Sequence, residues 1–299
     1  MSSVEVFVID AFTRTPNSGN RAGVVLDAAG LDSQQMQAIA AFAGYSETAF
    51  VLPADARDHD VHVRYFTPTR EVPICGHATI ATHFLRAVRG HAGQYPMVAK
   101  TGAGLLPVEL SQLHGDGALR VSMTQGVPEF MTPFGAIEQN RLVKALGIMS
   151  DDLMDLPVQI VSTGHSKVII PLRERKVLDG LKPDMPQLAA LSGDIGCNGF
   201  FPFVLEGSRA NPVTYGRMFA PAIGIDEDPV TGNANGPTGA YLVHHDLIDC
   251  DRSCTYPGHQ GVALGLPGTV YVTVSREGGK LKVQIAGEAV EVGTRMYSF

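Results

Sequence analysis

The sequence predicts two similar domains, each combining strands with helices, because a spaced series of motifs occurs twice along the chain. The segment Arg64–Pro68 (RYFTP) matches Arg217–Pro221 (RMFAP), about half of the chain later. Each copy continues into an acidic loop that contains proline, then a glycine (Gly76 or Gly232), and then small residues and an apolar run. Order and spacing repeat together, so we infer an internal duplication.

Local patterns assign elements to both copies. Apolar and polar residues alternate over 61–66, which predicts a strand. Apolar residues at helical spacing between Ile80 and Val88 predict a helix with His77 at or near its N-terminus. In the second copy, Gly232–Gly236 is expected to lead into a helix with Pro237 in its first turn, where a missing N–H costs least.

Glu47 is the candidate for acid–base chemistry. An amphipathic helix is predicted after Leu31–Ser33, ending near Gly44, and a strand is predicted over Ala49–Leu52. Glu47 would then occupy a partly buried corner just before that strand, which suits a general acid or base. The same position also suits a capping or solvated glutamate.

Composition excludes several classes of function. The 299 residues carry a net charge of −7 without a Lys/Arg cluster, which argues against nucleic-acid binding. We expect no signal peptide and no membrane span, hence a cytoplasmic protein. The four cysteines are scattered, so no disulfide framework is predicted. The boundary is placed at the proline- and glycine-containing segment Gly126–Gly135, giving lobes 1–126 and 127–299, with the last strand a candidate to return to the first lobe.

Each lobe is expected to present a glycine-led helix N-terminus, and two facing copies would form a cleft for an anion such as a carboxylate. Thr231 and Asn233 could donate hydrogen bonds there, and Asp228 is expected to point into the cleft. His77 could bind substrate or assist proton transfer. Cys75 is interpreted mainly as a packing residue, and no metal site is predicted.

The ordered motifs resemble those of the phenazine-biosynthesis PhzF-like family. The segments that carry this resemblance are GNRAGVVL (19–26), SETAFV (46–51), RYFTPTREVPICGHATIA (64–81) and RMFAPAIGIDEDPVTGNA (217–234). Three further segments are most similar to the YddE-type bacterial branch: STGHSKVIIPL (162–172), CNGFFPF (197–203) and GHQG (258–261).

This resemblance implies an α+β fold of the diaminopimelate-epimerase type. Two pseudo-symmetric domains would each wrap a barrel-like, mostly antiparallel sheet around a central helix, with the active site between them. By the same resemblance, Glu47 moves a proton, while His77 and Asp228 assist substrate binding. Gly76 and Gly232 present backbone N–H groups. The resemblance also implies no cofactor and a homodimer.

Three departures leave the substrate unassigned. Asn233 stands where the family often has serine, and Gly265–Gly268 (GLPG) replaces a common Gly-Arg-Pro-Ser turn. Cys75 matches the first thiol of the epimerase that names the fold, but Thr231 replaces the second, which disfavours two-thiol epimerisation.

The sequence therefore predicts a cofactor-independent isomerase that moves a proton on a small carboxylate-bearing metabolite, with Glu47 as the acid/base group. Cys75 and the helix starts would contribute to substrate binding. Two alternatives stay open: an epimerase or racemase that uses Glu47 with Asp228 or His77 as opposite bases, and a non-catalytic metabolite-binding protein.

Overall fold

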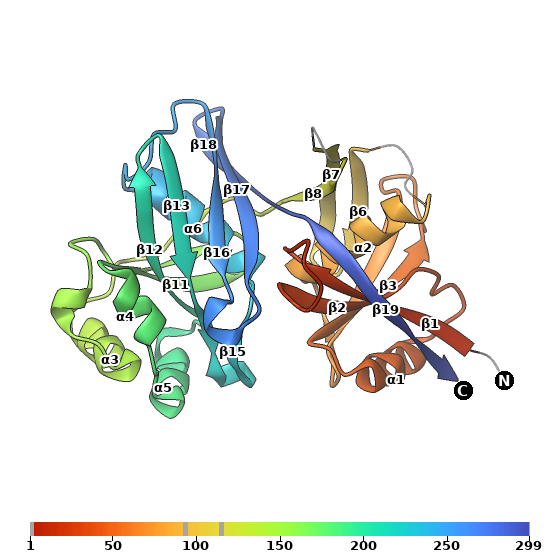
Figure 1. Ribbon diagram of the computed structural model, residues 1–299, viewed down its shortest axis with the longest axis horizontal. Coiled ribbons are helices and arrows are strands. Elements are labelled where there is room, and N and C mark those ends of the chain that lie inside the picture. The colour runs from red at the N-terminus through yellow and green to blue at the C-terminus, as the bar shows by residue number, and fades with distance from the viewer. Residues whose placement is uncertain (1–2, 92–94, 114–116, 299) are drawn as a thin grey trace. The chain divides into compact units, whose positions relative to one another are not determined.

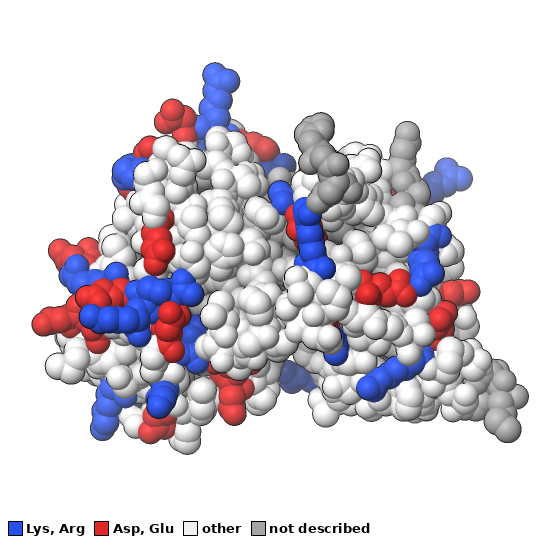
Figure 2. Space-filling model, viewed as in Figure 1, with Lys and Arg blue, Asp and Glu red and all other residues white. Residues whose placement is uncertain are grey.

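The computed structural model describes residues 3–91, 95–113 and 117–298. The chain forms two compact units (Figure 1): one comprises Met1–Thr124 with Ala286–Phe299, and the other comprises Gln125–Ile285. Among the described residues, no helix has the length and apolar character needed to cross a bilayer. On the face shown in Figure 2, lysine and arginine side chains are interspersed with acidic ones.

The first unit is a mostly antiparallel sheet with two helices. Its elements are β1 (Ser3–Ala11), β2 (Asn20–Val25), α1 (Ser33–Ala43), β3 (Glu47–Pro53), β4 (Val61–Phe66), β5 (Glu71–Val72), α2 (Gly76–Val88), β6 (Met97–Thr101), β7 (Gly104–Gln112), β8 (Leu119–Thr124) and β19 (Ala289–Ser298). Strand β19 pairs antiparallel with β1. Helix α2 is buried on almost all sides and packs against β1, β2, β3 and β8.

The second unit contains more helices. Its elements are β9 (Glu129–Phe130), α3 (Ala136–Leu146), η1 (Ser150–Asp152), β10 (Gln159–Ser162), β11 (Ser166–Leu172), α4 (Arg175–Gly180), α5 (Met185–Ile195), β12 (Phe200–Ser208), β13 (Asn211–Gly216), β14 (Met218–Ala220), η2 (Pro221–Ile223), β15 (Ile225–Asp228), α6 (Gly232–His244), β16 (Ser253–Gln260), η3 (Val262–Leu264), β17 (Gly268–Glu277) and β18 (Lys280–Gly287). Helix α6 packs against β10, β11 and β17.

The two units repeat one order of strand pairings. In the first, β2 and β3 are parallel on either side of α1, and β4 and β6 are parallel on either side of α2. In the second, β11 and β12 are parallel around α4 and α5, and β13 and β16 are parallel around α6. The predicted α+β architecture of two similar domains is confirmed.

The duplicated arginines explain why the R-x-F-x-P motif recurs. Arg64 makes a bidentate ion pair with Glu71, with N–O distances of 2.7 Å and 2.7 Å. Arg217 pairs in the same way with Glu227, at 2.9 Å and 2.8 Å. In each unit, this ion pair links the segment at Arg64 or Arg217 to the short strand (β5 or β15) that comes between it and the central helix. The planar guanidinium forms two parallel hydrogen bonds with the carboxylate.

Helix α1 matches its prediction closely, while the strand after it starts earlier than predicted. Asp32 caps α1, its side chain accepting a hydrogen bond from the Gln35 N–H, and the Gln35 side chain accepts from the Asp32 N–H. The helix ends at Gly44, which adopts the left-handed conformation. The correction is that Glu47 is the first residue of β3, because its backbone already pairs with Ala22 of β2.

The prediction for Pro237 was wrong. Helix α6 begins at Gly232, so Pro237 lies inside the helix and not in its first turn. The ring nitrogen has no hydrogen to donate to the carbonyl four residues earlier, which belongs to Asn233. Small residues on both sides and almost complete burial of the helix let packing hold it together despite that lost hydrogen bond.

Gly239 lies where α6 packs closely against β17. A Cβ atom at Gly239 would lie 2.5 Å from Cγ1 of Val272 and 3.0 Å from Cγ2 of Val274, both on β17. Gly193 in α5 faces open space. The same chemical change should therefore have opposite effects at these two helical positions.

We expect Gly193→Ala to raise the free energy of unfolding by about 0.5–1 kcal/mol, because alanine restricts the unfolded chain and favours helix. Gly239→Ala should instead lower it by about 1–2 kcal/mol, because the added methyl group overpacks the contact with β17. Urea denaturation of both variants measures the difference. Equal shifts of the same sign would contradict the proposed packing of α6.

Candidate functional site

The first unit brings Glu47, Cys75 and His77 together. Glu47 opens β3, Cys75 is the N-cap of α2, and His77 is the second residue of that helix. Oε2 of Glu47 lies 3.3 Å from Nε2 of His77, and the two side chains are 17% and 8% exposed. Sγ of Cys75 lies 3.4 Å from Nδ1 of His77. The imidazole thus stands between a carboxylate and a thiol.

This geometry allows proton exchange along a short row of groups. With its proton on Nε2, His77 donates to the Glu47 carboxylate and can accept from the Cys75 thiol at Nδ1. The Ser46 hydroxyl lies 3.3 Å from the same Nε2, which gives the ring a second polar neighbour on the Glu47 side. His77 can therefore orient the carboxylate and compensate its charge when Glu47 gains or loses a proton.

The same three side chains also satisfy the spacing of a three-ligand metal site. One ligand atom from each of Glu47, Cys75 and His77 lies within 4.8 Å of the other two. Carboxylate, thiolate and imidazole together suit a tetrahedral ion such as Zn²⁺, with one position left open. No metal site is predicted from the sequence, and it is the fold that brings Glu47 to Cys75 and His77.

The central helices of both units begin without a capping side chain. Neither Cys75, the N-cap of α2, nor Thr231, the N-cap of α6, accepts a hydrogen bond from the first turn through its side chain. Gly76 and Gly232 are the first helical residues. First-turn N–H groups without a side-chain cap, at the positive end of the helix dipole, suit an anionic ligand.

In the second unit, the predicted residues form a buried polar network. The Thr231 hydroxyl donates to Oδ2 of Asp228, which ends β15. Gln260 is 2% exposed and joins the two: its Nε2 donates to the Asp228 carbonyl at 2.8 Å and to Oγ1 of Thr231 at 3.1 Å. Its Oε1 accepts from the Thr231 N–H at 3.0 Å and from the Asn235 amide at 3.1 Å. Gln260 thus fixes the loop that leads into α6.

Asn233 has a buried polar atom to satisfy. It follows Gly232 in the first turn of α6, and its Oδ1 is buried without a hydrogen-bond partner among the described residues. Buried polar side-chain atoms are nearly always paired, so this atom points to a missing partner such as a ligand or water. The predicted role of Asn233 in substrate binding stays a prediction.

The predicted site residues divide between the two units. Glu47, Cys75, Gly76 and His77 gather at the start of α2, whereas Asp228, Thr231, Gly232 and Asn233 gather at the start of α6. Sequence reasoning missed two members of the second group, Gln260 and Lys167. Both lie in segments (GHQG and STGHSKVIIPL) that carried the resemblance, but neither stands beside a predicted site residue in the sequence.

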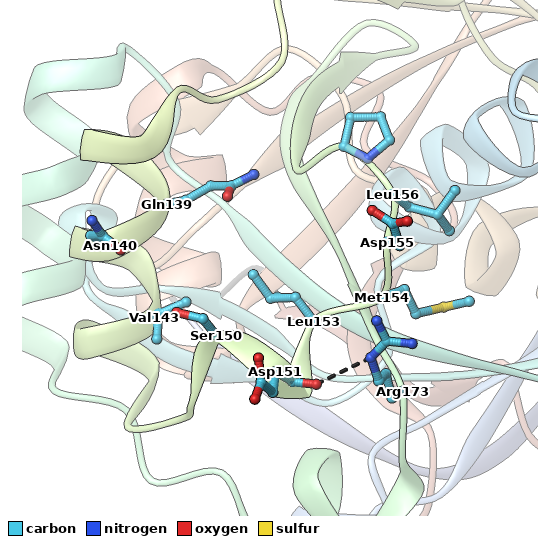
Figure 3. Close-up of a pocket in the computed structure, with 11 residues that line it drawn as sticks. Gln139, Asn140, Val143, Ser150, Asp151, Leu153, Met154, Asp155, Leu156 and Arg173 are labelled. Carbon is cyan, nitrogen blue, oxygen red and sulfur yellow. Dashed lines mark hydrogen bonds between the residues drawn. The ribbon is translucent and has the colours of Figure 1, made fainter.

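A separate pocket of about 440 Å³ lies in the second unit and contains none of the predicted residues (Figure 3). It is lined by residues of α3 and η1, by the segment 153–157 and by Arg173. Arg173 donates through Nε to the Asp151 carbonyl at 3.1 Å. The pocket lacks a close carboxylate–imidazole pair among its lining residues, so we place the candidate chemistry at Glu47 and His77 instead.

Comparison with known proteins identifies full-length relatives. A family model described as "phenazine biosynthesis-like protein" matches residues 9–295. The chain is 49% identical to the "uncharacterized isomerase YddE" of Escherichia coli O157:H7, over 96% of this chain and 95% of that protein. It is 32% identical to the trans-2,3-dihydro-3-hydroxyanthranilate isomerase of Pseudomonas chlororaphis, over 96% of each chain. The crystal structure of a Bacillus anthracis phenazine biosynthesis protein of the PhzF family superposes with a TM-score of 0.89, at 35% identity over 100% of both chains.

Replacing Gln260 should expose how much the α6 loop depends on it. Gln260→Leu leaves the Thr231 N–H, the Asp228 carbonyl and the Asn235 amide without this partner, so we expect a loss of about 2–4 kcal/mol in the free energy of unfolding. Gln112→Leu, at an exposed position, should change it by less than about 0.5 kcal/mol. Chemical denaturation measures both, and equal effects would contradict the role of the network.

Proposed function

Because the chain belongs to the phenazine biosynthesis-like protein family, we propose that it moves a proton on a small carboxylate-bearing metabolite, with Glu47 as the acid/base group. The protein is an isomerase, as its full-length relatives are named. The observation that supports the finer proposal is the contact of the Glu47 carboxylate with the buried His77 imidazole at the start of α2. The carboxylate of the metabolite would bind at uncapped helix N-termini.

The reaction proceeds in two proton transfers. The Glu47 carboxylate takes a proton from a carbon of the substrate, and the electron pair left behind moves into the conjugated system that ends at the substrate carboxylate. N–H groups at the helix start stabilise the negative charge that develops there. Glu47, now a carboxylic acid, returns the proton to another carbon, so no atom is gained or lost. His77 holds the carboxyl group in position throughout.

The duplication supports a single carboxylate base. Thr48 pairs with Phe66 in the first unit, and Phe200 pairs with Phe219 in the second, so the residue before Phe200 corresponds to Glu47. That residue is Gly199. The second unit therefore has no carboxylate at the matching position, which favours isomerisation by one base over epimerisation by two equivalent ones.

We extend the proposal to the helix starts. The substrate carboxylate would bind to first-turn N–H groups, since α2 and α6 each begin with a glycine and without a capping side chain. We further propose a cytoplasmic homodimer that needs no cofactor.

Glu47→Gln should remove the proposed base without unfolding the protein. In D₂O, the wild-type protein should place solvent deuterium on a carbon of trans-2,3-dihydro-3-hydroxyanthranilate or of another small carboxylate from a panel that includes the L-amino acids. The variant should do so at least about 100-fold more slowly, since a positioned base contributes about 10²–10⁴-fold. Proton NMR and mass spectrometry follow the label.

The matched control is Glu5→Gln, at an exposed position on β1 of the same unit, and it should keep the wild-type rate. Undiminished exchange in Glu47→Gln would refute the assignment of the base. Inversion at a single carbon would indicate an epimerase, and tight carboxylate binding without any exchange would indicate a binding protein.

The role of the Cys75–His77 contact can be tested separately from any metal. Dialysis against EDTA should leave the exchange rate unchanged if Glu47 acts without an ion. Cys75→Ala should slow exchange less than about tenfold, whereas His77→Asn should slow it by more, because His77 contacts the base directly. Loss of activity on EDTA treatment, with recovery on adding Zn²⁺, would instead favour metal chemistry at these residues.

A further inference from the structure

We propose that Lys167 is an anion-binding residue whose ammonium group holds the carboxylate of a small ligand at the start of α6. This inference rests on the proposed function in taking that ligand to be a small carboxylate. It is argued from the position of Lys167 in the repeat, from its burial and from the charges around it.

In the second unit, Lys167 lies across from Gly199, the residue that corresponds to Glu47 in the repeat. In the first unit, Ala22 of β2 pairs with Glu47 of β3. In the second unit, Val168 of β11 pairs with Phe200 of β12, and one residue earlier Lys167 lies beside Gly199. Residues in register on neighbouring strands point to the same face. In the first unit, the small residue of the pair (Ala22) is on the earlier strand and the titratable residue (Glu47) on the later one. In the second unit this order is reversed, with Lys167 on the earlier strand and Gly199 next to the later one.

The Lys167 side chain fills the space that a side chain at Gly199 would occupy. A Cβ atom at Gly199 would lie 2.4 Å from Cδ and 2.8 Å from Cε of Lys167. In the first unit the corresponding space belongs to Glu47, which reaches His77 at the start of α2. Helix α6 packs against β11, the strand that carries Lys167. We infer that Lys167 reaches toward the start of α6 as Glu47 does toward α2.

Lys167 is unusual among the lysines because it is only 8% exposed. Among the described residues, the acceptor within hydrogen-bond distance of its Nζ is the Ser166 carbonyl, at 3.1 Å. Burial lowers the pKa of Lys167, while the nearby Cys197 thiol and the Asp228 carboxylate act in the opposite direction. A buried ammonium gains most from an anionic partner, because charge is costly to leave unpaired in the interior.

The start of α6 offers further polar groups for the same ligand. The Asp228 carboxylate accepts a hydrogen bond from the hydroxyl of Thr231, the N-cap of α6. The acidic group that acts to raise the pKa of Lys167 is therefore bound to the start of this helix. Asn233, in the first turn, has a buried Oδ1 without a partner among the described residues. A carboxylate held by Lys167 at this point would lie at the positive end of the helix, and a hydrogen-bond donor elsewhere on the ligand could pair with Oδ1 of Asn233.

The experiment compares two probes that differ only in the group Lys167 would bind. Anthranilate carries the carboxylate, and anthranilamide replaces it with a neutral amide. Isothermal titration calorimetry should give the wild-type protein an affinity for anthranilate at least about tenfold higher than for anthranilamide, as expected for a charge-assisted hydrogen bond. In Lys167→Met, a variant of similar side-chain length, that preference should fall to less than about twofold.

Two further variants separate binding from folding. Lys144→Met, at an exposed position on α3 of the same unit, should keep the full preference. Gly199→Ala keeps the lysine but displaces its stem, and it should weaken anthranilate binding while leaving anthranilamide binding unchanged. If Lys167→Met does not fold, Gly199→Ala carries the test by itself.

Each outcome decides the proposal. A folded Lys167→Met protein that keeps the preference for anthranilate would overturn it, and so would a wild-type protein that binds anthranilate no better than the amide. Loss of the preference in Lys167→Met and Gly199→Ala would support it. Failure of the proposed isomerase activity shows separately, as absent deuterium exchange, and leaves this binding result standing.

Discussion

The chemistry proposed for this protein depends on the contact between the Glu47 carboxylate and the His77 imidazole. It exists because β3 begins at Glu47, directly after the helix that ends at Gly44, and because α2 begins at Gly76 without a capping side chain. The strand positions the carboxylate and the helix positions the ring, so neither depends on a mobile loop. The two side chains are largely buried and 3.3 Å apart, so the imidazole can hold the carboxyl group in position.

Duplication explains how one architecture provides two different chemical environments. Both units use a bidentate arginine–glutamate pair to anchor the strands before a central helix, and both helices start with an uncapped glycine. The side chains around those two starts differ. The first has a carboxylate, an imidazole and a thiol, whereas the second has a network held by Gln260 and the buried Lys167. The duplicated architecture therefore carries a carboxylate–imidazole pair in one unit and a buried lysine in the other.

The sequence predicted most of the fold because its signals are local or repeated. Alternation in 61–66, the limits of α1 and the glycine that begins each central helix are all properties of short segments. Pro237 misled the prediction, since its preference for a first turn was outweighed by the burial of α6. Lys167 and Gln260 could not be found, because their importance comes from strand register and burial that join distant segments. The contact of Glu47 with His77 was hidden for the same reason, although each residue had been singled out separately.

The fate of an isotope shows whether one carboxylate both removes and returns the proton. A substrate that carries deuterium at the labile carbon is converted in ordinary water under single-turnover conditions, and the product is examined by NMR. We expect part of the deuterium to reappear at the second carbon on the same face, because Glu47 would carry it between the two carbons. Complete loss of the label, with inversion at the first carbon, would contradict the claim.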